Sequence, residues 1–207
     1  MDLRYILTTE EIDKFILIGK IKEYEEGAVL FYENMSADFF YIILEGFVKG
    51  GFFGGNKERV FHFFFPSMMV GEVSFREKNK YPLTAVFVTK GKALLVTRKA
   101  MNYASYNSSV IDDIFIRSII GKVRYLQNSI NMMATSDSKL KTAMFLVEHQ
   151  YWLSNISIKE IGSVLNTTRE TISRSIAFFI QMRALKKIGN KMEIIDLALL
   201  KAYIASN

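Results

Sequence analysis

The residue types best suited to a specific chemistry lie together in the segment from Thr168 to Arg174. Arginine donates paired hydrogen bonds to guanine, and glutamate accepts a hydrogen bond from cytosine. Arg169, Glu170 and Ser173 share this segment with Arg174, and a helix that begins near Thr168 presents all of them at its N-terminal end. The pattern predicts recognition of base edges in double-stranded DNA. Apolar spacing alone would suit two amphipathic helices of any α-helical domain, so the prediction rests on these polar residues.

Two short amphipathic helices joined by a tight turn are predicted to position these residues. Asn166 lies where the chain must turn, and asparagine tolerates the left-handed conformation better than most residues. Thr167 or Thr168 then supplies the hydroxyl that caps the second helix. The segment is therefore predicted to be a helix-turn-helix. Its apolar residues recur at helical spacing: Ile158, Ile161, Val164 and Leu165 in the first helix, and Ile172, Ile176, Phe179 and Ile180 in the second.

The sequence has a net charge of +6, and nearly all of the excess lies in the C-terminal third. Residues 138–207 contain ten Lys or Arg and five Asp or Glu, whereas residues 1–137 contain seventeen and sixteen. Residues 185–195 are typical of a β-hairpin wing, which places Lys187 and Lys191, with Lys186, to contact phosphates. A domain that neutralises the phosphates of DNA needs such an excess of basic residues. The alternative is a basic surface that is only solvated, which has the same composition.

Residues 1–108 have the composition of a β-roll. After a helix predicted to begin at Thr8, at least seven short runs rich in Phe, Tyr, Val and Ile are separated by Gly or Asn. Residues 54–57, Gly-Gly-Asn-Lys, are a hairpin turn signal between two such runs. Many short strands with turns between them favour a sandwich or roll.

Residues 109–136 are predicted to form a long helix, with a hinge at its end, that pairs with a second copy of the chain. β-branched residues at one core position of a heptad, with Leu or Met at the other, favour a parallel two-stranded coiled coil. The alternative is a helix packed on its own domain; Ile111, Ile114, Phe115 and Ile120 suit that packing, so both can hold. Residues 137–207 are predicted to form the DNA-binding domain. The seam residues are spaced three and four apart: Ile116, Ile119, Val123, Leu126, Ile130 and Met133.

The composition excludes several classes of protein. The absence of cysteine rules out disulfides, iron–sulfur clusters and thiolate zinc sites. A metal-dependent enzyme on a β-roll needs a cluster of His and carboxylates, whereas His62 and His149 are far apart in the sequence. No apolar run reaches the ~18 residues of a membrane span, and the first residues lack a signal-peptide pattern. We expect a cytoplasmic protein without metal or membrane partner that is not an enzyme.

The order of β-roll, long helix and winged helix-turn-helix resembles the CRP/FNR family of bacterial transcription regulators over essentially the whole chain. Residues 168–174, Thr-Arg-Glu-Thr-Ile-Ser-Arg, are close to the family's recognition-helix pattern. Glu45-Gly46 and Val70-Gly71-Glu72 match its roll. The resemblance implies an α+β fold, with an N-terminal β-roll of the cyclic-nucleotide-binding jelly-roll type, a long dimerisation helix and a C-terminal winged helix-turn-helix.

The resemblance also implies a homodimer that binds a palindromic operator. Binding would occur when a small-molecule effector in the roll fixes the two dimer helices in one arrangement. Arg169 would contact a guanine, Glu170 a cytosine and Arg174 a second guanine, while Ser173 matches the FNR branch. RNA polymerase would be a further partner if the protein is an activator. The alternative is a ligand-binding module of the same fold without regulated DNA binding, which leaves the last 70 residues unexplained.

The effector site departs from the pattern that binds cyclic nucleotides. Gly71, Glu72 and Thr84 are in place, but Leu83 stands where that pattern has an Arg for the phosphate. Leucine cannot neutralise a buried phosphate, so cyclic AMP is not expected. No other cofactor is expected, because a lone His62 in a Phe-rich strand is more typical of packing than of haem ligation.

An apolar or aromatic effector is the remaining option. Phe63 and Tyr81, together with Phe61 and Phe65, are candidates to line its pocket, although core packing is the other role open to each. Residues 121–125, Gly-Lys-Val-Arg-Tyr, are similar to the halorespiration regulators of this family, which sense chlorinated phenols. Lys122 would there pair with a phenolate. The alternative is a solvated lysine beside the coiled-coil seam.

Overall fold

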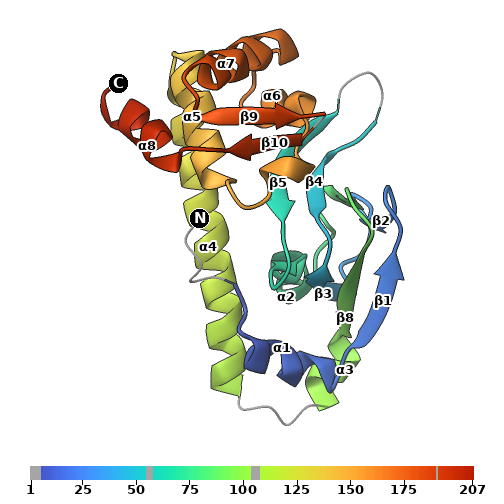
Figure 1. Cartoon of the computed structure of the whole chain (residues 1–207). Helices are drawn as coiled ribbons and strands as arrows, with labels where there is room; N and C mark the ends of the chain where they lie inside the picture. Colours follow the sequence, from blue (N-terminus) through green and yellow to red (C-terminus); the bar gives the residue numbers. More distant parts are fainter. Residues whose placement is uncertain (1–5, 55–57, 104–107, 190) are drawn as a thin grey trace. The chain divides into compact units, whose positions relative to one another are not determined.

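The structure is a computed structural model that describes residues 6–54, 58–103, 108–189 and 191–207. The chain forms two compact units, Asp2–Arg124 and Tyr125–Asn207. The boundary between them falls within a single helix, α4, which spans Ser108–Ala134 (Figure 1). The mixed helix-and-sheet fold predicted from the sequence is confirmed. Residues 55–57 of the predicted hairpin turn lie outside the described residues.

The first unit contains two four-stranded antiparallel sheets that form the roll. One sheet has the strand order β1-β8-β3-β6, and the other has the order β2-β7-β4-β5. Neighbouring strands are thus often distant in the sequence, because the chain passes repeatedly between the two sheets. The strands are β1 (Lys20–Tyr24), β2 (Val29–Phe31), β3 (Phe39–Glu45), β4 (Val48–Phe52), β5 (Arg59–Phe64), β6 (Met69–Val70), β7 (Thr84–Phe87) and β8 (Gly91–Thr97).

Aromatic rings join the roll to its helices in one core. Phe40 on β3 is fully buried, and its ring meets three others in edge-to-face geometry. These rings are Phe15 in α1 (Thr9–Ile16), Phe75 in α2 (Glu72–Glu77) and Phe115 in α4, at centroid distances of 5.5, 5.0 and 5.2 Å. Each such pair contributes roughly 0.5–1.5 kcal/mol beyond its buried area. The first turns of α4 therefore belong to the core of the roll.

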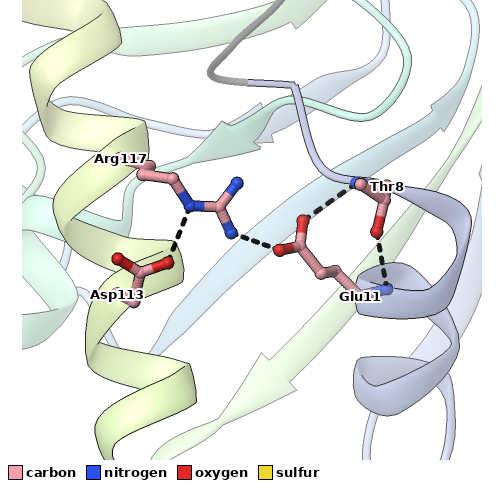
Figure 2. A network of polar contacts seen from close by, with 4 residues as sticks. All are labelled: Thr8, Glu11, Asp113 and Arg117. Carbon is pink, nitrogen blue, oxygen red and sulfur yellow. Dashed lines mark hydrogen bonds and ion pairs between the residues drawn. The ribbon is translucent and has the colours of Figure 1, made fainter.

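A polar network ties α1 to α4 within the same unit (Figure 2). Thr8 and Glu11 form a capping box, in which the Glu11 N–H donates to Thr8 Oγ1 at 3.2 Å and the Thr8 N–H donates to the Glu11 carboxylate at 2.9 Å. The Arg117 guanidinium pairs with the same carboxylate and donates to Asp113 at 2.9 Å. Glu11 thus stabilises the start of α1 and also holds it to α4.

Helix α4 has two apolar faces with different environments. Ile111, Ile114 and Phe115 are buried in the roll core. The six predicted seam residues are exposed, from 36% for Ile119 to 60% for Ile130. An apolar stripe of this length on the surface of a single chain is a feature of interaction sites. The stripe consists of Ile116, Ile119, Val123, Leu126, Ile130 and Met133.

The second unit is a winged helix-turn-helix. Asp137 caps its first helix by accepting the Lys139 N–H at 2.8 Å. Buried apolar residues from every helix, including Phe145, Ile161, Phe179 and Leu200, form its core. The order of elements is α5 (Ser138–Glu148), a 3₁₀ turn (Leu153–Asn155), α6 (Ile158–Val164), α7 (Arg169–Gln181), β9 (Leu185–Ile188), β10 (Lys191–Ile194) and α8 (Leu197–Ala205).

Candidate DNA-binding and effector sites

Three local features define α6 and the turn that joins it to α7. Ser157 caps α6 in a capping box with Glu160, whose carboxylate accepts the Ser157 N–H at 2.8 Å. Asn166 has the left-handed conformation predicted for it, with φ at 48°. Gly162 allows a close approach of the returning chain, because a Cβ here would lie 3.0 Å from the Thr167 carbonyl oxygen. The capping box begins α6, and Asn166 and Gly162 direct the chain from α6 into α7 within a few residues.

The N-terminal end of α7 is capped, polar and exposed. The Thr168 hydroxyl accepts the Thr171 N–H at 3.2 Å, and Arg174 donates to Thr171 Oγ1 at 3.4 Å. The pKa of Glu170 is lowered, first because its carboxylate accepts its own backbone N–H and then because it accepts a hydrogen bond from Thr168. Glu170 is thus a carboxylate, the form that accepts a hydrogen bond from cytosine. The exposed polar residues at this end are Thr168, Arg169, Glu170, Ser173 and Arg174.

The opposite face of α7 is anchored in the unit. Ile172, Ile176 and Phe179 are buried at helical spacing. The one hydroxyl hydrogen of Ser175 is shared between two acceptors, the Thr171 carbonyl at 3.1 Å and the Ser138 carbonyl, at the start of α5, at 3.3 Å. Since one face is fixed in this way, the polar face is held toward solvent.

The wing contributes three exposed lysines, Lys186, Lys187 and Lys191. Lys186 lies opposite Glu193 in the strand register, and their side chains form an ion pair at 2.8 Å. Lys187 and Lys191 are exposed. Because the charge of Lys186 is offset by a carboxylate, Lys187 and Lys191 are the stronger candidates for phosphate contact.

Glu72, at the first position of α2, lies at the centre of the candidate effector region. Its side chain is fully buried and pairs with the Lys122 ammonium of α4, whose side chain is 19% exposed. The Ser118 hydroxyl, one helical turn before Lys122, donates to the same carboxylate at 2.7 Å. Lys122 Nζ also lies 5.5 Å from the centroid of the Phe64 ring. The structure therefore brings the predicted Glu72 and Lys122 together, and Lys122 is not a solvated lysine.

Apolar side chains surround Leu83, the residue that the sequence resemblance aligns with the arginine of cyclic-nucleotide sites. A Cβ on Gly50 would lie 3.0 Å from the Phe64 ring and 3.1 Å from Leu83 Cδ1, so both side chains close over this glycine. The Thr84 hydroxyl is buried and accepts the Glu33 N–H at 3.0 Å. Leu83 thus packs against β4 and presents neither charge nor hydrogen-bond donor.

Two predicted effector residues lie elsewhere in the roll. Phe63 is fully buried and stacks on Phe47 at 5.2 Å; because side chains alternate along β5, it faces away from Phe64. Tyr81 is buried, stacks on Phe31 at 3.8 Å and donates its hydroxyl hydrogen to the Phe39 carbonyl at 2.6 Å. Gly71 lies against the Tyr81 ring, since a Cβ on it would be 2.7 Å from Tyr81 Cε1.

Sequence reasoning missed Ser118 and Phe64 in the candidate effector region. Ser118 precedes Lys122 by four residues, a spacing that places both on one helix face, so this signal was present in the sequence. Phe64 carried no such signal, because β5 is aromatic on both faces. Among the residues that the structure describes, no group of three or more His, Asp or Glu could hold a metal ion. No helix in the described part of the chain is long and apolar enough to cross a membrane.

The chain matches two family models and is similar to a known regulator. Residues 21–104 match the cyclic nucleotide-binding domain, and residues 141–203 match the Crp-like helix-turn-helix domain. A CRP-like cAMP-activated global transcriptional regulator of Mycobacterium tuberculosis is 22% identical over 186 residues, which cover 84% of this chain and 83% of that protein.

Two solved structures have the same fold at low sequence identity. FixK2 from Bradyrhizobium japonicum superposes with a TM-score of 0.76 and 18% identity, covering 89% of this chain and 96% of that one. A CooA mutant from Carboxydothermus hydrogenoformans superposes with a TM-score of 0.75 and 16% identity, covering 97% and 99%. At these identities the superpositions establish the fold.

Proposed function

Since the chain belongs to the CRP/FNR family of transcription regulators, we propose that it binds a palindromic operator as a homodimer under the control of a small molecule in the roll. The family consists of transcription regulators and not of enzymes. The observation that carries the proposal is the exposed polar end of α7, where Arg169, Glu170 and Arg174 project from a capped helix whose other face is buried.

The proposed dimer uses the exposed stripe of α4. Its residues follow the heptad spacing of a parallel coiled coil. Burial of this stripe between two copies would stabilise the dimer by about 25 cal/mol per Å² of apolar surface. A parallel pair of helices relates the two DNA-binding units by a two-fold axis. The half-sites of the operator should then be centred about one helical turn apart, ~34 Å.

The proposed effector is a neutral or phenolic aromatic molecule and not cyclic AMP. Leu83 gives a phosphate no counter-charge, and Glu72 is already engaged by Lys122 and Ser118. An aromatic ligand near Phe64 and Lys122 would bury apolar surface, and a phenolate would compete with Glu72 for the ammonium. Such a ligand acts only by its difference in affinity between two arrangements of the protein.

The experiment begins with selection of a binding sequence from randomised DNA duplexes by the purified full-length protein. On the selected duplex, Arg174→Ala should cost ~1–3 kcal/mol and relax the preference at one guanine. Lys187→Ala should weaken all duplexes alike and reduce the salt dependence of binding. Base preferences unchanged by Arg174→Ala would remove that residue from the proposed contacts. Failure to select any sequence would favour a ligand-binding module without DNA binding.

A further inference from the structure

The last ten residues of α4 belong to the DNA-binding unit. Tyr125 is the first residue of that unit, and Tyr125, Ser129 and Met132 are buried at 9%, 8% and 4% exposure. Their spacing of four and three residues places them on one helical face. Leu126 and Ile130, on the neighbouring face, are at least half exposed. This part of α4 therefore has one face for a partner helix and another that is packed within its own unit.

A buried hydrogen bond links this inner face of α4 to the end of α5. The Tyr125 hydroxyl lies 3.3 Å from His149 Nε2, and His149 Nδ1 lies 3.0 Å from the Phe145 carbonyl oxygen. The imidazole stacks on the Phe145 ring with centroids 4.0 Å apart and meets the Tyr125 ring edge-on. His149 is 2% exposed and follows directly after the last residue of α5.

These contacts define the tautomer of His149. A carbonyl oxygen only accepts hydrogen bonds, so Nδ1 must carry the proton in its contact with Phe145. In a neutral ring Nε2 is then the acceptor, and the Tyr125 hydroxyl donates to it. Burial lowers the pKa of His149 to about 4, so the ring is neutral near pH 7. In the hydrogen bond between α4 and α5, the Tyr125 hydroxyl is therefore the donor and His149 Nε2 is the acceptor.

Helix α5 also contacts the recognition helix, α7. Its first residue, Ser138, accepts the Ser175 hydroxyl of α7 through its carbonyl at 3.3 Å. Lys139 Nζ lies 4.1 Å from the centroid of the Phe178 ring of α7. The seam-bearing helix is thus held to α5 at the end of α5, and α7 is held to α5 at its start.

We propose that Tyr125 and His149 are positioning residues for operator recognition: their hydrogen bond fixes the angle between α4 and α7, and so the separation of the two recognition helices in the dimer. The inference rests on the proposed DNA-binding dimer and deepens it. Neither residue touches DNA in this mechanism. They determine which spacing of half-sites the dimer accepts.

The test compares half-site spacing preferences. Duplexes derived from the selected operator, with one or two base pairs added to or removed from the centre, are titrated with the full-length protein and with Tyr125→Phe. Loss of one neutral hydrogen bond should reduce the preference for the selected spacing by about 2- to 10-fold. Tyr203→Phe is the matched control, because it removes a phenol hydroxyl from the same unit, where the ring packs on Phe178 and Phe179.

The outcomes separate the inference from the proposed function. A wild-type protein that selects no sequence overturns the DNA-binding function and this inference with it. A wild-type protein that selects an operator, with Tyr125→Phe weakening all spacings equally or none, overturns the inference alone. Reduced discrimination in Tyr125→Phe but not in Tyr203→Phe supports it.

A second measurement does not depend on the variant folding. Nitrogen-15 NMR of the wild-type protein, labelled at histidine, distinguishes the two neutral tautomers of His149 and follows their titration. The expected result is a proton on Nδ1 and a neutral ring throughout the range from pH 6 to 8, in contrast to an exposed histidine with its pKa near 6.5. A proton on Nε2 would leave Nδ1 without a hydrogen beside the Phe145 carbonyl oxygen, so the contacts that orient the His149 ring would be wrong and the inference would fall with them.

Discussion

Replacement of Lys122 by methionine tests the buried ion pair of the roll. The variant retains the length and much of the apolar surface of the lysine stem but leaves the Glu72 carboxylate, which is fully buried, without its counter-charge. Breaking a buried pair on one side costs roughly 3–5 kcal/mol. Because Lys122 retains 19% exposure, the lower end of that range applies, and we expect a loss of about 3 kcal/mol in the free energy of unfolding.

Glu72→Gln is the second variant, and with Lys122→Met it completes a double-mutant cycle. It removes the negative charge of Glu72 and keeps the shape of the side chain. The Lys122 ammonium can then turn toward solvent, and the amide oxygen still accepts the Ser118 hydroxyl, so the expected cost is about 1–2 kcal/mol. In the double variant neither charge remains, and its cost should be close to that of Glu72→Gln alone. The coupling energy between the two positions is therefore expected to equal the cost of Lys122→Met, about 3 kcal/mol.

The assay is urea denaturation followed by circular dichroism, with the first unit monitored separately by limited proteolysis. Lys20→Met is the matched control, because Lys20 is an exposed lysine of the same unit, and a surface substitution of this kind should stay within about 0.5 kcal/mol. A coupling energy below about 0.5 kcal/mol would refute the reasoning. It would mean that the Glu72 carboxylate and the Lys122 ammonium contribute almost no interaction energy to the folded state.

Three further predictions concern the dimer, the buried histidine and the effector. Leu126→Lys places a charge in the proposed seam, so sedimentation should show a monomer at micromolar concentration; a fully dimeric variant would exclude the seam as the main interface. Burial lowers the pKa of His149 from 6.5 to about 4, so the unfolded chain binds more protons between these values. The free energy of unfolding should therefore be at its full value above pH 6.5 and fall by up to about 3 kcal/mol as the pH is lowered toward 4. If the free energy of unfolding of His149→Gln depends on pH as steeply as that of the wild type, this prediction is wrong. Calorimetric titration with cyclic AMP should show no binding, and micromolar affinity would mean that a basic residue replaces the arginine missing at Leu83.

The helix-turn-helix was predictable because its determinants are local. The left-handed conformation of Asn166 was inferred from residue type and position, and the structure confirms it. The N-cap was narrowed to Thr167 or Thr168, and the structure shows that it is Thr168. Each depends on contacts within three or four residues along the chain. Local rules of this kind hold wherever the tertiary structure leaves the backbone in its preferred conformation.

The effector region was only partly predictable because its contacts join distant segments. Glu72 was identified from its motif, but its partner Lys122 is 50 residues away. The inner face of β5 was also ambiguous. Residues 61–65 read Phe-His-Phe-Phe-Phe, so alternation gives no polar face from which to choose. The register shift between Gly50 and Gly51 in the β4–β5 pair adds an irregularity that no turn signal predicts.

The division of the chain at 108 and 136 stays a prediction about its folding domains, whereas the contact units meet between residues 124 and 125. Nothing in the sequence marks this boundary, because α4 contains no proline and runs without a break from Ser108 to Ala134. Lys122, which pairs with Glu72 of the roll, and Tyr125, which bonds to His149 of the DNA-binding unit, are three residues apart in that helix. The Lys122–Glu72 ion pair and the Tyr125–His149 hydrogen bond thus lie within less than one turn of α4. A ligand that separated Glu72 from Lys122 would act on the helix immediately before the residue that we assign to positioning α7. Tyr125→Phe should therefore also weaken the effect of any such ligand on operator binding.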